Sequence, residues 1–138
     1  MDSLQRATVA LLIVGDDLIP AEVSAMLGGS PQFAVAKGEQ FLAKHGKKVE
    51  AKTGNWQFGG GWESPSYLDR QINELLSALT NDMSRWREVT NRYHSYLSVG
   101  GYFNDWTGGM TLSPDTLRLL ADRNLPIDFD LYAPAASN

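Results

Sequence analysis

Residues 7–14 read ATVALLIV and are apolar except for Thr8, and the next three residues read GDD. Apolar runs of this length that are rich in β-branched side chains are typical of a strand buried on both faces. Glycine and aspartate then favour a turn. Pro20 fits the first turn of a helix, and Gly28 is a typical helix end. The stretch therefore predicts a central strand that leads into a short helix.

The strongest helical pattern runs from about Pro65 to Tyr93, where apolar residues recur at three- and four-residue steps. This spacing predicts one long helix with a buried face, with a break signal at residues 80–82. Shorter patterns predict a strand at 55–58 that ends at three glycines, strands at 95–104 and 127–132, a hairpin arm at 110–112, and a helix from Pro114 to about Arg123.

A weak internal repeat relates residues 18–26 to residues 112–120, since both follow the pattern of an apolar residue, a proline and two further apolar positions. Chance and a duplication of two β-α-β halves both explain it. We expect an α+β fold, a two-layer sandwich in which a mixed or mostly antiparallel sheet of four to six strands carries about three helices on one face. Pseudo-duplicated β-α-β halves are one interpretation of this fold.

The length of 138 residues predicts a single domain over residues 1–138. Its core is expected at about residues 7–132. Residues 30–52 lack a regular apolar pattern and are rich in lysine, which predicts a partly irregular basic loop. Residues 133–138 are expected to form a tail.

The composition excludes several kinds of site. With 12 basic and 16 acidic side chains the net charge is −4, which opposes binding to nucleic acid. The absence of cysteine excludes disulfides and thiolate metal sites, and two histidines are too few for a histidine-rich metal site. No apolar run is long enough to span a bilayer, and no secretory signal pattern is present, so we expect a cytoplasmic protein without a cofactor.

Several short motifs spread along the chain suggest a known family. They read GDDLIP at 15–20, KG at 37–38, KTGNW at 52–56, YF at 102–103, LSP at 112–114 and DFDLY at 128–132. Over about residues 8–132 the chain resembles the small, mostly bacterial family catalogued as domain of unknown function 4279. The resemblance implies a fold, but no established activity and no catalytic residues. Ile19 departs from the polar cap expected before the proline.

Four aspartates suggest one candidate site. Asp128 and Asp130 are two residues apart in a predicted strand and must share one face. With Asp16 or Asp17 they would form a carboxylate site for a divalent cation. The alternative function is therefore a small enzyme or ligand-binding protein that uses such a cation. The ordinary interpretation of the pair in the strand is that alternating charges keep an edge strand or a solvated sheet face soluble.

Aromatic residues beside glycine-rich turns suggest a second candidate site, at Trp56, Trp62, Tyr102 and Trp106. Trp62 and Trp106 lie in predicted turns, where no strand or helix period buries them. Exposed aromatic residues are typical anchors of protein interfaces, although loop aromatics also fold back over a sheet edge.

Lysines between residues 37 and 52 give that segment a local charge of +3, with Lys47 and Lys48 at its centre. Such asymmetry steers acidic partners, and an ordinary solvated loop is the alternative. We therefore expect a non-catalytic module that binds another protein, of the inhibitor or immunity type, acting on a cytoplasmic partner. Neither nucleic acid nor a membrane is an expected partner, and the oligomeric state stays open.

Overall fold

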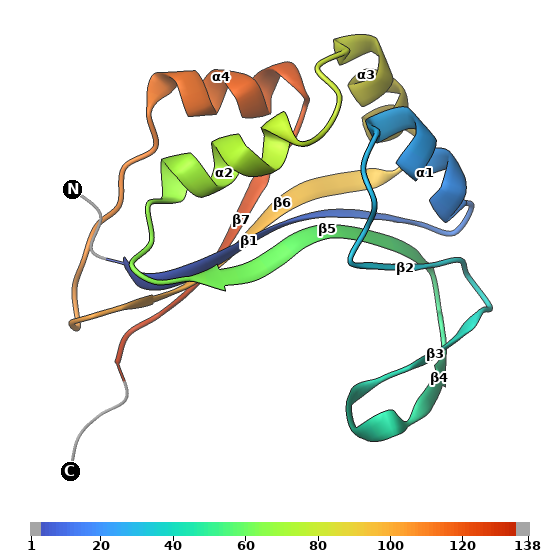
Figure 1. The fold of residues 1–138 in the computed structure, drawn as a ribbon, viewed down its shortest axis with the longest axis horizontal. Coiled ribbons are helices and arrows are strands. Elements are labelled where there is room, and N and C mark those ends of the chain that lie inside the picture. The colour runs from blue at the N-terminus through green and yellow to red at the C-terminus, as the bar shows by residue number, and fades with distance from the viewer. Residues whose placement is uncertain (1–3, 135–138) are drawn as a thin grey trace.

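A five-stranded sheet in the order β2-β5-β1-β6-β7 is the first layer of the computed structural model, which describes residues 4–134 (Figure 1). Helices form the second layer. The strands of the sheet are β1 (Leu4–Gly15), β2 (Phe33–Val35), β5 (Gly54–Glu63), β6 (His94–Phe103) and β7 (Ile127–Tyr132). The helices are α1 (Pro20–Leu27), α2 (Leu68–Ser77), α3 (Met83–Arg92) and α4 (Pro114–Asp122). The predicted α+β two-layer sandwich is confirmed.

The central strand β1 has the two faces that its sequence requires. Every second side chain, Ala7, Val9, Leu11 and Ile13, is buried and belongs to the core cluster that the helices complete. The intervening side chains point to the opposite face of the sheet. Because β1 pairs with β5 on one side and with β6 on the other, its backbone is satisfied on both edges.

The strand directions explain the internal repeat. Strand β1 is antiparallel to β5 and β6, β2 is antiparallel to β5, and β7 is parallel to β6. Strand β2 is therefore parallel to β1. The chain thus contains two β-α-β units, β1-α1-β2 and β6-α4-β7, as the repeat predicts. They differ because β5 lies between β1 and β2, whereas β6 and β7 are neighbours.

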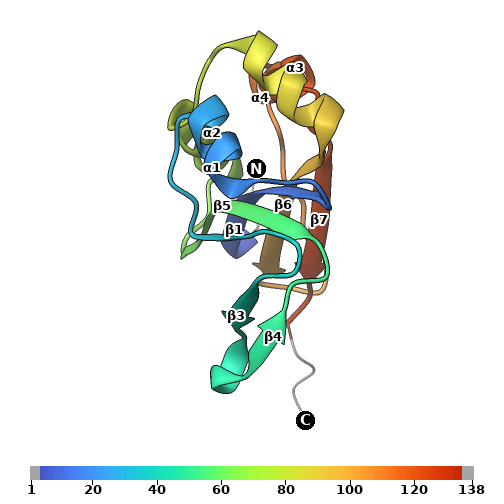
Figure 2. The ribbon, with the colours of Figure 1, turned by 90° about the vertical axis from the view of Figure 1, so that its right-hand side faces the viewer.

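The helices all cover the same face of the sheet, which leaves the other face without a helix (Figures 1 and 2). The helical pattern predicted for residues 65–93 does not form one continuous helix: the chain is interrupted at the break signal of residues 80–82 and forms α2 and α3. Asp82 caps α3 by accepting a hydrogen bond from the Ser84 amide at 2.9 Å, and the Thr80 hydroxyl accepts one from the Asp82 amide. Residues 4–134 therefore contain four helices rather than about three, and none is long and apolar enough to cross a membrane.

Residues 30–52 are more regular than expected. They contain β2 and a hairpin of β3 (Gln40–Leu42) and β4 (Lys48–Glu50), which are joined by a single 3₁₀ turn at Lys44–Gly46. The hairpin extends from the sheet on the side away from the helices (Figure 2). The two strands of the hairpin bond each other's backbone, so they form although residues 40–50 lack a regular apolar pattern. The hairpin arm predicted at 110–112 is wrong, since these residues form no strand.

The three glycines at 59–61 do not end the strand as expected but form a bulge inside β5. Ala10 pairs with Gly59 and Thr8 pairs with Trp62, so three steps on β5 oppose two steps on β1. Gly59 has a φ of 90° and Gly60 a φ of 109°, a region that other residues rarely adopt. A side chain at Gly59 would also lie 2.7 Å from Leu75 Cδ1 and from the Val9 carbonyl oxygen.

This geometry predicts different effects for two alanine substitutions. Gly59→Ala should lower the free energy of unfolding by about 1–3 kcal/mol, because it combines an unfavourable φ with a steric clash. Gly61→Ala is the matched control, since nothing lies within 4 Å of its Cβ position. Urea unfolding of both variants measures the difference. Equal stability of the two variants would contradict this account of the bulge.

Candidate functional site

The uncovered face of the sheet carries a cluster of four side chains, which we call the aromatic platform: Arg6 of β1, Trp62 of β5, Tyr102 of β6 and Tyr132 of β7. Arg6 pairs with Tyr102, and Tyr102 pairs with Tyr132, so these three residues stand side by side across neighbouring strands. Their chain neighbours Ala7 and Gly101 are buried. Since side chains alternate along a strand, the platform residues point away from the helices.

The platform is a cluster of three rings in which the Arg6 guanidinium contacts the faces of Tyr102 and Trp62, and in which only Tyr102 and Tyr132 are stacked. Arg6 Cζ lies 4.4 Å from the centre of the Tyr102 ring and 5.0 Å from that of the Trp62 ring. The ring centres of Trp62 and Tyr102 are 5.8 Å apart, and those of Tyr102 and Tyr132 are 5.3 Å apart with nearly parallel planes. Cation-π contacts of this kind each contribute about 0.5–1 kcal/mol at exposed sites. These contacts therefore order side chains that face solvent.

The bulge in β5 explains why Trp62 belongs to the platform. Trp56 and Phe58 face the helices, and two-residue alternation from them would turn Trp62 toward the helices as well. The extra residue at 59–61 reverses the alternation, so Trp62 pairs with Thr8 on the uncovered face. The indole lies beside Gly100, with its Cη2 at van der Waals distance, 3.8 Å, from the Cβ position of that glycine. In this position Trp62 remains 51% exposed to solvent.

A hydrogen bond at the outer edge of the platform alters the chemistry of Tyr132. Its hydroxyl donates to Asp130 Oδ2 at 2.7 Å, and both side chains are exposed. This hydrogen bond, together with the negative charge of the carboxylate, raises the pKa of Tyr132 above its ordinary value. The phenol therefore stays neutral and remains a hydrogen-bond donor at physiological pH.

Removal of the Asp130 charge should lower the pKa of Tyr132. In Asp130→Asn the hydrogen bond to a carboxylate and the repulsion of the phenolate are both lost, so the pKa should fall toward its ordinary value near 10.0. Asp128→Asn is the control, because Asp128 lies on the same face of β7 but does not bond Tyr132. An NMR titration of the Tyr132 ring measures both. An unchanged pKa in Asp130→Asn would contradict the assignment.

The structure separates the aromatic residues predicted from the sequence. Trp62 and Tyr102 lie together in the platform. Trp106 is 73% exposed but lies in the segment between β6 and α4, outside the platform. The prediction of Trp56 as a partner-binding residue is wrong, because its side chain is 0% exposed. Its ring stacks on Phe58 and its Nε1 donates to Ser24 Oγ at 3.0 Å, which anchors α1 to the sheet.

Lys47 and Lys48 are exposed at the β3-β4 hairpin, as predicted, but they do not join the aromatic residues. The hairpin precedes Gly54 at the beginning of β5, whereas Trp62 is near the end of that strand. The eight residue steps from Gly54 to Trp62 span about 25 Å in an extended strand. The hairpin and the platform are thus two separate surfaces.

The four aspartates of the alternative metal site do not converge. Asp128 pairs with Ser98, which is opposite Ala10, while Asp16 follows the end of β1 at Gly15. These levels of the sheet are about 16 Å apart. The pKa of Asp16 is lowered most by a hydrogen bond from the Thr53 side chain and next by one from Lys37. Between residues 4 and 134, no three His, Asp or Glu side chains are grouped as a metal ion would require.

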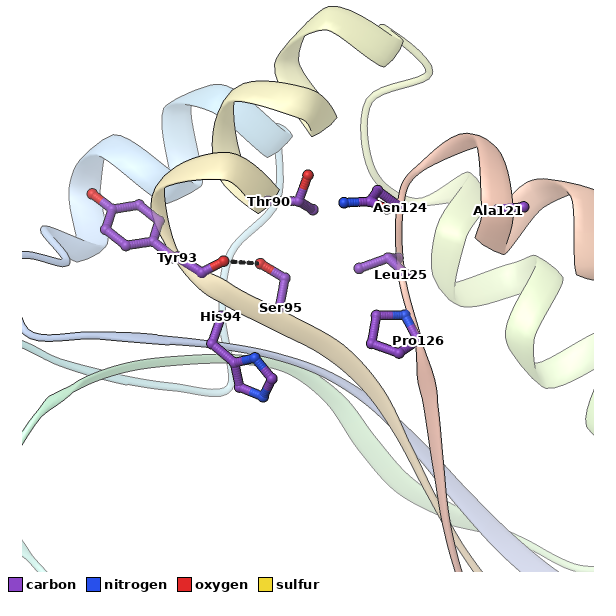
Figure 3. A pocket seen from close by; sticks show the side chains of 8 residues that line it. All are labelled: Thr90, Tyr93, His94, Ser95, Ala121, Asn124, Leu125 and Pro126. Atoms are coloured by element: carbon purple, nitrogen blue, oxygen red, sulfur yellow. Dashed lines mark hydrogen bonds between the residues drawn. The ribbon is translucent and has the colours of Figure 1, made fainter.

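A hollow of about 560 Å³ lies where α3 leads into β6 and α4 ends (Figure 3). Two of its hydroxyl groups are already used in the fold. Ser95 Oγ donates to the Tyr93 carbonyl at 3.2 Å, and Thr90 Oγ1 donates to the Trp86 carbonyl at 2.9 Å. The Tyr93 ring points away from the hollow (Figure 3). The hydroxyls of Ser95 and Thr90 therefore serve the backbone, and the platform is the better candidate site.

Sequence reasoning missed two platform residues, Arg6 and Tyr132. The signal for Tyr132 was present, since Asp128, Asp130 and Tyr132 follow one another at two-residue steps and so share one face of the strand. Arg6 could be placed only after the pairing of β1 with β6 was known.

Comparison with known proteins gives one match. The family described as "Domain of unknown function (DUF4279)" matches residues 5–134, nearly the whole chain. The chain belongs to this family. The resemblance noted from the sequence motifs is thereby confirmed. No curated protein and no solved structure matches the chain. Membership in DUF4279 assigns no activity, so function has to be inferred from the geometry of the site.

Proposed function

We propose that this DUF4279 protein is a non-catalytic protein-binding module that contacts a cytoplasmic partner through the aromatic platform. The observation that carries the proposal is the cluster of mutually contacting side chains Trp62, Arg6, Tyr102 and Tyr132 on the sheet face that no helix covers. Tryptophan, tyrosine and arginine are the residues most enriched at the energetic centres of protein interfaces.

Preorganisation supports this proposal. The arginine side chain is flexible and normally loses rotamer freedom when it enters an interface. In this protein two rings already hold Arg6 in place. The hydrogen bond to Asp130 likewise orients the Tyr132 hydroxyl. Binding of a partner would therefore cost little side-chain entropy, because these side chains already lose that entropy when the protein folds.

The charges beside the platform indicate the chemistry of the partner. Asp128 and Asp130 are exposed on the same face as Tyr132, and the chain as a whole carries a charge of −4. A partner surface with basic side chains complements this region and associates faster than a neutral one. We propose that the module is of the inhibitor or immunity type, which needs a rigid, complementary surface and no chemistry of its own.

Partner capture by the full chain tests the proposal. The wild type should retain a stoichiometric protein from cytoplasmic extract of the native host and inhibit its activity. Trp62→Ala should weaken the purified complex by about thirtyfold, as expected for removal of a central aromatic anchor. The double variant Lys47→Ala/Lys48→Ala is the control, because the hairpin is a separate surface. Calorimetric titration measures both affinities.

Two results would contradict this function. The first is that the wild type retains no stoichiometric protein from several extracts. The second is that Trp62→Ala binds as tightly as the wild type while the hairpin variant loses binding, which would move the interface to Lys47 and Lys48. Melting temperatures of the variants establish that each is folded.

A further inference from the structure

A second hollow, of about 580 Å³, lies on the helical layer and is independent of the platform. It is bordered by the end of α2, the segment that joins α2 to α3, and the end of α4. The residues that line it are Asn73, Leu76, Ser77, Leu79, Thr80, Asn81, Leu119 and Arg123. Among these, the only charged side chain is that of Arg123, and none is acidic.

Arg123 is an unusual residue for the wall of a hollow, because only 6% of its surface is exposed. Its Nη1 donates to the Leu119 carbonyl at 3.1 Å, which is a typical contact at a helix end. Its Nε is buried and has no hydrogen-bond partner. The ion pairs found between residues 4 and 134 do not include Arg123. A buried guanidinium group without an anion is energetically costly.

The neighbouring groups hold this guanidinium in place, and the charge of Asp122 acts on it without forming an ion pair with it. Its Cζ lies 5.6 Å from the centre of the Trp86 ring, and Trp86 Nε1 donates to the Thr80 carbonyl at 2.8 Å. The carbonyls at the end of α4 are already engaged, since Leu120 accepts from the Arg123 and Leu125 amides. Burial lowers the pKa of Arg123, although an arginine remains charged at neutral pH.

Two further groups on the wall are suited to an anion. Thr80 Oγ1 accepts a hydrogen bond from the Asp82 amide, which leaves its own proton to be donated. Asn81 is exposed beside it and carries two amide protons. Arginine is the side chain that best matches the planar geometry of carboxylate and phosphate oxygens.

We propose that the hollow between α2 and α4 binds a small oxyanion, a phosphate or a carboxylate, through the guanidinium group of Arg123. Thr80 and Asn81 would supply the neighbouring donors. The site lies on the helical side, so its occupation does not depend on whether the platform binds a protein.

Binding is tested by following the Trp86 indole N–H and the Arg123 Nε–H by NMR while inorganic phosphate is added at constant ionic strength. A parallel titration with acetate distinguishes carboxylate from phosphate as the preferred anion. Wild-type protein should show saturable shifts at both groups with at least one of the two anions. Arg123→Met should weaken the affinity by about tenfold or more, since it removes the charged donor.

The matched control is Arg118→Met, which removes an arginine from the exposed side of the same helix, where it pairs with Asp115. This variant should bind the anion as the wild type does. If Arg123→Met does not fold, Arg123→Lys replaces it, because lysine keeps the charge but loses the planar pair of donors. That variant should also bind more weakly than the wild type.

Three results would overturn the proposal. The first is the absence of saturable shifts in the wild type with either anion at concentrations up to tens of millimolar. The second is an equal loss of affinity in Arg118→Met, which would indicate a general charge effect. The third is full affinity in the Arg123 variant, which would leave that residue with a structural role only, as a cap for α4 and a contact for Trp86.

Discussion

The packing of helices against a single face of β1 is the constraint on which the rest of the structure depends. Ala7, Val9, Leu11 and Ile13 form a nearly solvent-free row in the middle of the sheet. Burial of such a row supplies the main driving force for folding, and it fixes the register of β5 and β6, because a shift by one residue would turn polar side chains into the core. It also decides which face of the sheet no helix covers.

The sequence was most informative where one local pattern determines the structure. The apolar row of β1, the helix after Pro20 and the alternating strand at 127–132 needed only the periods of strands and helices. Between residues 65 and 93 the apolar spacing favoured one helix and only the break signal at 80–82 favoured two, and in the structure the hydrogen bonds to Thr80 and Asp82 lie in the link that precedes and caps α3. The spacing of apolar residues does not show where polar side chains will bond the backbone and compete with helical hydrogen bonds.

The candidate site was only half visible in the sequence for a related reason. Tyr102 and Trp62 attract attention as aromatic residues, yet so does Trp56, which the fold buries beneath α1. Arg6 becomes part of the site through strand pairing between residues almost a hundred positions apart. Burial and long-range pairing are properties of the assembled sheet. The residues that carry the proposed anion site, on α4 and between α2 and α3, are brought together in the same way.

Because of the extra residue in β5, the face on which Trp62 lies depends on how many residues the strand has between Phe58 and Trp62. Deletion of one glycine from 59–61 would restore simple alternation and direct the indole of Trp62 toward α2. The amino acid itself would be unchanged, but it would become part of the interior. Homologous chains that differ by a single indel at this position would therefore present different side chains on the uncovered face of the sheet, even if every aromatic residue were retained.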